Sequence, residues 1–458
     1  MNLDKEDNKV KILALNGLLG YGYSEKAFEN ALKGEIAVIG VDAGSTDAGP
    51  FYLGAGKSFT SRSAVKRDVE IALPVALNRK IPFIIGTAGG AGADVHVDWV
   101  KDIIEEIARE KKLHFKMAVI RTEISKDYLK TKLREGKVKS LGGPPLTEEE
   151  IDKSVRLVSQ IGATPYLKAL EGNPDVILAG RSCDTAIYAA IPLKMGYDPG
   201  LVWHAAKIIE CGAMAAEPGT AGDCMMADIH EDYFILEPPN PIRKTNPIKV
   251  AAHSLYEQPN PYYIYEPEGM MDLTQSKYEQ YTERSVKVSG SRYVKAEKPT
   301  IKIEGVKKIG YRVIAMGATR TRLMIENMDT ILEQIREHIK NVLKKIKPED
   351  YILNFRVYGK NGVLGEIEPL KDLSHELFII IDVIGKTPDI ARTVCAVSRS
   401  SLLHFDYKGR KTTAGNIAFP YSPSDVEMGE VYVFNVYHVV EVDDLAETSR
   451  IEFINVGG

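Results

Sequence analysis

Cysteine is scarce in this chain, and its spacing excludes two common uses of the residue. The 458 residues include only Cys183, Cys211, Cys224 and Cys395, and no Cys-x-x-Cys pair occurs among them. A zinc ribbon needs such pairs, and a disulfide framework needs a higher density of cysteine. We therefore expect free thiols in a protein of the reducing cytoplasm.

Long apolar runs and an excess of charge are also missing. The net charge is −4, which gives no electrostatic reason to expect nucleic-acid binding. No apolar run approaches the length of a membrane span. The first nine residues are polar and of mixed charge, which is not the pattern of a signal peptide. Neither nucleic acid nor a membrane is expected as a partner.

The standard nucleotide fingerprints are absent from the sequence. No Gly-x-x-x-x-Gly-Lys-Ser/Thr motif occurs. After the strand-like run 10–15, glycines at positions 17, 20 and 22 follow the spacing Gly-x-x-Gly-x-Gly, the reverse of the dinucleotide fingerprint. Gly17 and Gly20 are retained as cofactor-binding candidates, and a nucleotide-dependent dehydrogenase or ligase remains an alternative.

What the sequence does contain is a regular alternation of strand-like and helical patterns. Short apolar runs lie at 10–15, 36–41, 81–86, 117–120 and 176–179, each followed by a helical pattern. This rhythm predicts an α/β fold, with an N-terminal parallel Rossmann-like sheet that has helices on both faces over residues 1–236. Residues 237–280 are rich in proline and predict a connector. Grouped strands and two helices over 281–458 predict a C-terminal α+β domain.

The stretch 81–110 combines an apolar run, a glycine-rich loop and an amphipathic helix. The loop contains Gly86, Gly89, Gly90 and Gly92, and Asp94 stands where an N-cap is expected. Glycines let a backbone approach a ligand closely, and the first N–H groups of a helix favour an anion. We predict that this loop binds phosphate or carboxylate. The alternative is a tight strand-to-helix turn without a ligand.

A polar loop follows the second predicted strand. Asp42, Ser45, Thr46 and Asp47 lie there, and ligands bind beyond the carboxyl ends of strands in open α/β sheets. We therefore predict that these four residues bind a cofactor, although a loop that only caps the next helix is an alternative.

A divalent metal also remains open. Asp42, Asp47, Asp94 and His96 supply oxygen and nitrogen donors on neighbouring loops. Spacing along the chain does not by itself bring the four together, so the metal-binding residues stay unassigned.

Charged residues also follow the fifth predicted strand and end a later helix. Arg181 and Asp184 come directly after the strand-like run 176–179. Glu210 lies between apolar residues in a helix predicted over 201–216. A buried glutamate has a raised pKa, which suits a general acid or base. The alternative is a partly exposed helix glutamate.

Several longer segments together resemble a known family. They are Gly180-Arg181 with Asp184, Glu210-Cys211-Gly212-Ala213, Ala252-His253-Ser-Leu-Tyr256-Glu257, and the segment 414–425. The chain resembles the acyclic terpene utilisation (AtuA-like) family over most of its length. This resemblance implies a fold and a setting in catabolism.

We expect a cytoplasmic enzyme that acts on a small organic acid or an acyl-CoA thioester. A lyase, hydratase or isomerase working by general acid–base chemistry fits best. Glu210 or Asp184 would move the proton, Arg181 would hold a carboxylate through two hydrogen bonds, and His253 is a fourth catalytic candidate. Coenzyme A enters as a carrier of the substrate, and a homo-oligomer is the usual assembly. A non-catalytic subunit that binds a metabolite is a further alternative.

Overall fold

The computed structural model describes residues 9–457, which divide into two compact units. The larger unit contains Met1–Lys307 together with Phe434–Gly458, and the smaller contains Lys308–Val433. The boundaries differ from the sequence-based division at 236 and 280. The larger unit includes the end of the chain because that segment returns to pair with one of its strands, and it also includes residues 281–307.

The larger unit is built on a ten-stranded sheet. The five predicted strands are present, pair in parallel and lie side by side at its centre. In spatial order they are β1 (Val10–Ala14), β2 (Val38–Asp42), β3 (Phe83–Gly86), β7 (Val176–Ala179) and β4 (Phe115–Arg121). Their carboxyl ends therefore meet at one edge of the sheet.

The sheet as a whole is mixed, which corrects the expectation of a purely parallel one. Beyond β1 it continues through antiparallel strands, and at the other edge a C-terminal strand pairs antiparallel with β4. These additions are β9 (Met225–Ile229), β10 (Tyr233–Glu237), β15 (Val286–Ser289), β14 (Lys277–Gln280) and β21 (Arg450–Val456). They come from parts of the sequence outside the βα repeats, so the repeat pattern did not predict them.

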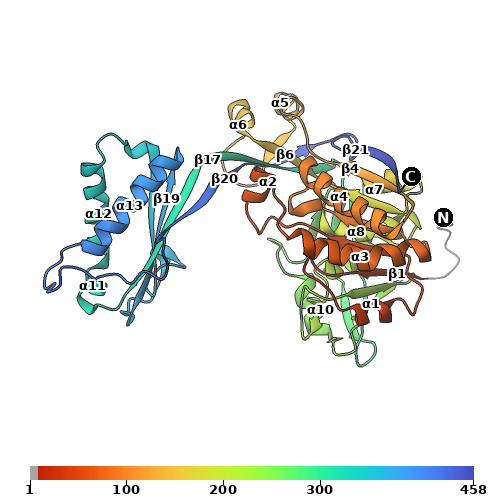
Figure 1. The fold of residues 1–458 in the computed structure, drawn as a ribbon. Helices are drawn as coiled ribbons and strands as arrows, with labels where there is room; N and C mark the ends of the chain where they lie inside the picture. The colour runs from red at the N-terminus through yellow and green to blue at the C-terminus, as the bar shows by residue number, and fades with distance from the viewer. Residues whose placement is uncertain (1–8, 458) are drawn as a thin grey trace. The chain divides into compact units, whose positions relative to one another are not determined.

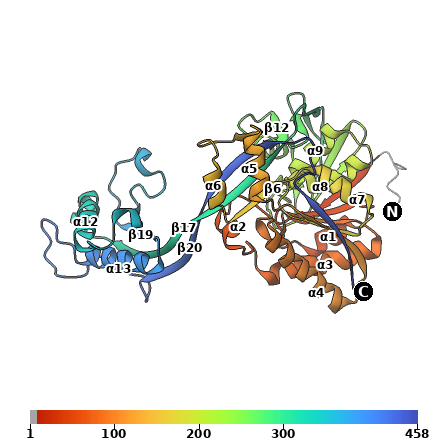
Figure 2. The ribbon, with the colours of Figure 1, turned by 90° about the horizontal axis from the view of Figure 1, so that it is seen from above.

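Helices cover both faces of the central strands, as predicted. Alternate residues of β1 enter different cores: Ile12 packs into one, and Leu13 into the other. Helices α1 (Glu25–Ala31), α3 (Arg62–Arg79) and α4 (Asp94–Lys111) contribute to the Leu13 core, and α7 (Ala163–Glu171), α8 (Asp184–Lys194) and α9 (Pro199–Ile209) to the Ile12 core. Figure 2 shows the two sets on opposite sides of the strands, and in the view of Figure 1 the set with α3 and α4 lies in front.

The proline-rich segment is more regular than a connector. It contains β11 (Lys244–Thr245), α10 (Pro247–Ser254), β12 (Tyr263–Glu266) and β13 (Gly269–Asp272). Prolines are accommodated because Pro247 begins α10, where its missing N–H has no helical partner. With β16 (Arg292–Lys295), the two longer strands form a three-stranded antiparallel sheet.

Shorter elements complete the larger unit. They are α2 (Phe51–Ala55), α5 (Lys126–Arg134), β5 (Val138–Ser140), α6 (Glu148–Lys153), β6 (Arg156–Gln160) and β8 (Ala216–Glu217). Two long strands, β17 (Thr300–Thr319) and β20 (Asp425–Glu441), cross the division between the units. In the larger unit, β6 pairs with the start of β17, and β5 pairs with the end of β20.

The smaller unit combines strands with three helices. Strands β18 (Tyr351–Tyr358) and β19 (Leu377–Gly385) pair antiparallel, and β19 pairs with β17. Apolar side chains of α11 (Arg322–Glu326), α12 (Met328–Val342) and α13 (Pro388–His404) pack with these strands in one core. In the described part of the chain, no helix has the length and apolar character needed to cross a membrane.

Candidate functional site

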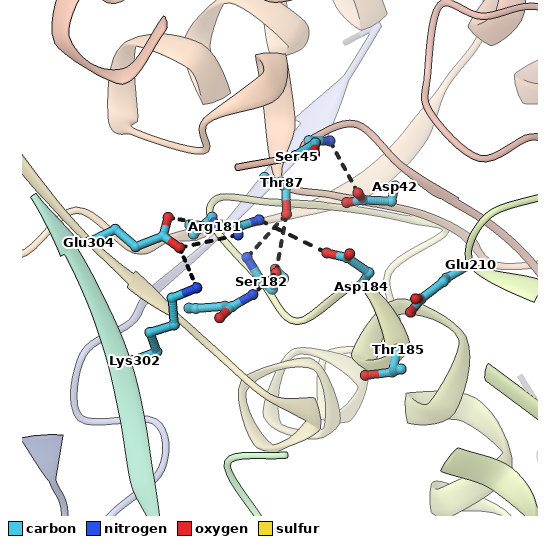
Figure 3. Close-up of polar contacts among 12 residues, drawn as sticks. Asp42, Ser45, Thr87, Arg181, Ser182, Asp184, Thr185, Glu210, Lys302 and Glu304 are labelled. Atoms are coloured by element: carbon cyan, nitrogen blue, oxygen red, sulfur yellow. Dashed lines mark hydrogen bonds and ion pairs between the residues drawn. The ribbon is translucent and has the colours of Figure 1, made fainter. Parts of the chain in front are cut away.

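A polar cavity of about 400 Å³ lies in the larger unit at the carboxyl ends of the parallel strands. Its lining includes six of the residues predicted from the sequence, namely Ser45, Thr46, Asp47, Arg181, Asp184 and Glu210. In Figure 3, Lys302 and Glu304 lie on one side of Arg181, and Asp184 and Glu210 lie on the other. The cavity thus unites a loop after β2, a loop after β7 and the end of α9.

The three loops expected to meet at this edge are in direct contact. Ser45 N donates to Gly90 O at 3.3 Å, which joins the loop after β2 to the loop after β3. Arg181 N donates to Gly92 O at 3.2 Å, which joins the loop after β3 to that after β7. Parallel pairing of β2, β3 and β7 brings the loops together, as the sequence predicted.

The glycine-rich loop does not line the cavity. A Cβ on Gly92 would lie 2.1 Å from Arg181 N, and one on Gly86 would lie 2.3 Å from Ile187 Cδ1. Gly89 and Gly90 have φ of 63° and 100°, a region that favours glycine. Gly92 thus lets the loop after β3 pack against the backbone at Gly180 and Arg181, while Gly86, Gly89 and Gly90 lie close to the side chains of Ile187, His96 and Phe59.

The start of α4 already has a carboxylate of this chain at its N–H groups. Asp94 N donates to Glu123 Oε2 at 3.0 Å, so part of the predicted anion site is taken by Glu123. The prediction of Asp94 as N-cap is wrong, because Ala93 is the N-cap and Asp94 is the first helical residue. The Asp94 carboxylate instead pairs with Arg450 Nη2 at 2.6 Å.

The donors considered for a metal do not form a cluster. His96 Nε2 lies 3.2 Å from Tyr52 O and 3.1 Å from Lys57 O, so it is engaged by backbone. Within residues 9–457, no group of three or more His, Cys, Asp or Glu side chains is arranged to hold a metal ion.

The loop after β1 is organised around a buried carboxylate. Asp68 Oδ2, from α3, accepts hydrogen bonds from Asn16 Nδ2, Gly20 N and Gly22 N at 3.0, 2.9 and 3.1 Å. A Cβ on Gly17 would lie 2.7 Å from Cys211 O. Gly17 is therefore required by close packing against Cys211, and Gly20 N binds Asp68. Neither glycine lines the polar cavity.

Arg181 is a buried cation with one nitrogen left for a ligand. Its side chain is held by Glu304, with Nε 3.1 Å from Oε2 and Nη2 3.4 Å from Oε1. Nη1 lies 3.9 Å from Asp184 Oδ1 and makes no hydrogen bond to any described residue. A buried guanidinium N–H without a partner is costly, and a ligand in the cavity could satisfy it.

Glu210 ends α9 and forms a buried ion pair with Lys207. The helix ends at Ile209, earlier than predicted, and Glu210 is its C-cap. Lys207 Nζ lies 2.5 Å from Glu210 Oε1, and both residues are 5% exposed. Burial raises the pKa of Glu210 to about 8 although the Lys207 ammonium favours the charged form. The alternative of an exposed helix glutamate is wrong.

Two aspartates lie beside Arg181. Burial, and then the charge of Asp184, raise the pKa of Asp42, whose Oδ2 accepts from Gly44 N at 3.2 Å. Burial also raises the pKa of Asp184, against the effect of Arg181. Asp42 itself does not line the cavity. These carboxyl groups thus favour protonation more than ordinary aspartates do.

His253 lies on α10, next to the cavity lining but not in it. Its ring stacks on Tyr256 with the centroids 4.8 Å apart. Burial and the nearby Lys207 lower its pKa to about 4, so the imidazole is neutral near pH 7.

Sequence reasoning missed several lining residues. Lys207 had a local signal, because it stands three positions before Glu210 and so shares its helix face. Glu257 follows α10 and lies in a segment of the family resemblance, whereas Glu266 and Lys302 had no local signal. Strands β12, β17 and β20 bring Glu266, Lys302 and Tyr437 from distant parts of the chain.

A second cavity of about 400 Å³ adjoins the polar one in the same unit. The two share lining residues that include Gln160, Cys183, Glu266, Lys302 and Tyr437. The second is less polar, and its own lining adds Leu141, Pro259, Pro267, Thr300 and Val439. A ligand in the polar cavity could extend along this wall.

Comparison with known proteins identifies the family of the chain. The model of the family described as "Acyclic terpene utilisation family protein AtuA" matches residues 57–412, more than half of the chain. The chain belongs to this acyclic terpene utilisation (AtuA) family. Membership points to a metabolic role in acyclic terpene catabolism. No curated protein and no solved structure matches the chain.

Proposed function

We propose that this AtuA-family protein is an enzyme that moves a proton on a small organic acid or its coenzyme A thioester. The reaction class is that of a lyase, a hydratase or an isomerase. Glu210 transfers the proton, and Asp184 assists it from the neighbouring wall of the cavity. Arg181 holds the carboxylate or the thioester carbonyl of the substrate.

The observation that carries this proposal is the environment of Glu210. A general acid or base works best when its pKa lies near the working pH. Burial raises the pKa of Glu210 to about 8, and the carboxyl group lines the polar cavity. Perturbed carboxyl groups in a cleft are common at active sites. The Lys207 ammonium, 2.5 Å away, keeps the carboxyl oriented.

The cations of the cavity support an anionic or carbonyl substrate. Arg181 lines the cavity, and its Nη1 has no hydrogen-bond partner among the described residues. Lys302 Nζ pairs with Glu304 Oε1 at 2.8 Å and also lines the cavity. An oxyanion that develops beside these donors would be stabilised as the proton leaves.

The adjoining cavity supports a substrate with a carbon chain. Leu141, Pro259 and Val439 offer apolar contacts next to the polar end. A free acid would occupy the two cavities alone, whereas a thioester would extend its coenzyme A part into solvent.

The test is a thermal-shift screen of the purified full chain against malate, β-hydroxybutyrate, crotonyl-CoA and β-hydroxybutyryl-CoA. We expect at least one ligand to raise the melting temperature and to exchange a carbon-bound proton for deuterium in heavy water, followed by NMR. Glu210→Gln should bind the same ligand and lose turnover by about 100-fold or more. Glu297→Gln, at an exposed position, is the matched control.

Arg181→Lys keeps a positive charge beside Glu304 but removes the planar pair of donors. We expect it to weaken binding by about tenfold, the loss of about 1.4 kcal/mol. Absence of both binding and exchange with all four ligands would contradict the proposal. Wild-type activity in Glu210→Gln would show that Glu210 is not the proton-transfer residue.

A further inference from the structure

We propose that Glu266 is a second proton-transfer residue of the polar cavity and that it works as the partner of Glu210. This inference rests on the proposed function. It assigns a role to a residue that comes from the proline-rich segment and that no local pattern in the sequence indicated.

Glu266 and Glu210 reach one cavity from unrelated elements. Glu266 is the last residue of β12, and Glu210 is the C-cap of α9. Both line the polar cavity, and Glu266 also lines the less polar one. A substrate that spans the two cavities therefore passes Glu266.

The Glu266 carboxyl is held in position by the start of α8. Thr185 Oγ1 donates to Glu266 Oε1 at 2.8 Å. Thr185 follows Asp184, so one helix turn supplies both a carboxyl group of the cavity and the hydroxyl that orients Glu266. A carboxyl fixed by a hydroxyl keeps its other oxygen for a substrate.

The neighbouring Glu268, between β12 and β13, has a structural role and serves as a comparison. Its Oε1 accepts from Thr164 N at 2.9 Å and from Thr164 Oγ1 at 3.1 Å, in the first turn of α7. A carboxylate there complements the positive end of the helix. Glu266, two residues earlier, caps no helix and lines the cavity instead.

The environments of the two glutamates suit different roles. Burial raises the pKa of Glu266 to about 7, partly against hydrogen bonds from Thr185 and Cys183. Burial raises the pKa of Glu210 to about 8. Both carboxyl groups can therefore gain and lose a proton near neutral pH. The Thr185 hydroxyl that donates to Glu266 favours its charged form, so we assign Glu266 as the base and Glu210 as the acid.

With these roles, the two glutamates would remove water from a β-hydroxy acid or its thioester. The Glu266 carboxylate takes the proton from the carbon next to the carbonyl, and the C–H electron pair moves toward the carbonyl oxygen to give an enolate beside Arg181. That electron pair then forms the carbon–carbon double bond. The C–O bond to the hydroxyl breaks as Glu210 gives its proton to the leaving oxygen. Water leaves, and proton exchange with solvent resets the two carboxyls. Hydration is the reverse.

The first experiment needs no substrate. Infrared difference spectra of the full chain, recorded across neutral pH, follow the carbonyl stretch of protonated carboxyl groups. We expect a signal that titrates near pH 7 in the wild type and is lost in Glu266→Gln. Glu268→Gln should retain this signal at lower pH, because the charge of Glu268 raises the pKa of Glu266. Thr185→Val should move it to higher pH.

The second experiment uses β-hydroxybutyrate and β-hydroxybutyryl-CoA in heavy water. We expect Glu266→Gln to lose deuterium incorporation next to the carbonyl by about 100-fold, and Glu210→Gln to keep incorporation while losing water release. Incorporation at the wild-type rate in Glu266→Gln, or an unchanged infrared titration, overturns the role of Glu266 alone. A wild type that incorporates no deuterium from either probe overturns the proposed function together with it.

Discussion

Lys207 and Glu210 lie one helical turn apart at the end of α9, with Nζ 2.5 Å from Oε1. Lys207 Nζ also lies 3.2 Å from Glu257 Oε2 and stands 5.0 Å from the centroid of the Tyr256 ring. The ammonium thus joins α9 to the segment after α10. Glu257 has φ of 71°, an uncommon conformation for a residue other than glycine. Such strain occurs often at functional sites.

The stability of the protein should depend on pH through Glu210. Its pKa is raised from 4.5 in the unfolded chain to about 8 in the folded one. The folded state therefore holds a proton that the unfolded state has released between these values, so stability falls as pH rises through this window. We expect the free energy of unfolding to fall less steeply there in Glu210→Gln, measured by urea denaturation at several pH values.

Lys207→Met is the companion variant for that measurement. Without the ammonium, the pKa of Glu210 should rise further, because Lys207 favours the charged carboxylate. The variant should lose more stability above pH 8 than below it. An equal loss at every pH would mean that the ion pair does not control the protonation of Glu210.

Gly92 should tolerate substitution far less well than Gly49. Both have positive φ, of 69° and 80°, so alanine is strained at either position. A Cβ on Gly92 would lie 2.1 Å from Arg181 N, whereas a Cβ on Gly49 would have no atom within 4 Å. We expect Gly49→Ala to cost about 1 kcal/mol and Gly92→Ala about 3 kcal/mol or more, with displacement of Arg181.

Circular dichroism melts of both glycine variants measure this difference, and the thermal shift by the best ligand of the screen reports on Arg181. Gly92→Ala should lose the ligand-induced shift, and Gly49→Ala should retain it. Similar stability losses in the two variants would show that backbone conformation, and not the contact with Arg181, sets the requirement for glycine.

Asp68 should be important for stability. Asp68→Ala leaves Asn16, Gly20 N and Gly22 N without their acceptor. We expect a loss of about 3 kcal/mol in the free energy of unfolding, because each buried donor left unpaired costs about 1–3 kcal/mol. Urea denaturation of Asp68→Ala and Asp68→Asn measures it, and the asparagine variant should lose less because its amide oxygen still accepts.

The same variants test whether the loop after β1 binds a nucleotide. Fluorescence titration with reduced nicotinamide dinucleotide should give no binding in the wild type, since the Asp68 carboxylate occupies the N–H groups that a phosphate would need. Saturable binding in the wild type would revive the dehydrogenase alternative.

Local sequence patterns predicted the features that depend on local physics. The apolar runs at β1, β2, β3, β4 and β7 are short and end in turn residues, and parallel pairing then brings their carboxyl ends together. Arg181 and Asp184 were found because they directly follow β7. Ser24 is the N-cap of α1 and accepts from Ala27 N, a contact between residues three positions apart in the sequence.

Tertiary structure alone decided which polar groups share the cavity. The sequence indicated an anion site at Gly86–Asp94, but Glu123, which follows β4, accepts from Asp94 N at the helix N-terminus there. Glu266 and Lys302 reach the cavity through β12 and β17, whose partners are β13, β6 and β19. Whether a carboxyl group is buried, and which cation lies beside it, depends on such distant contacts. For that reason, the raised pKa values of Glu210 and Glu266 follow from the fold and from no motif.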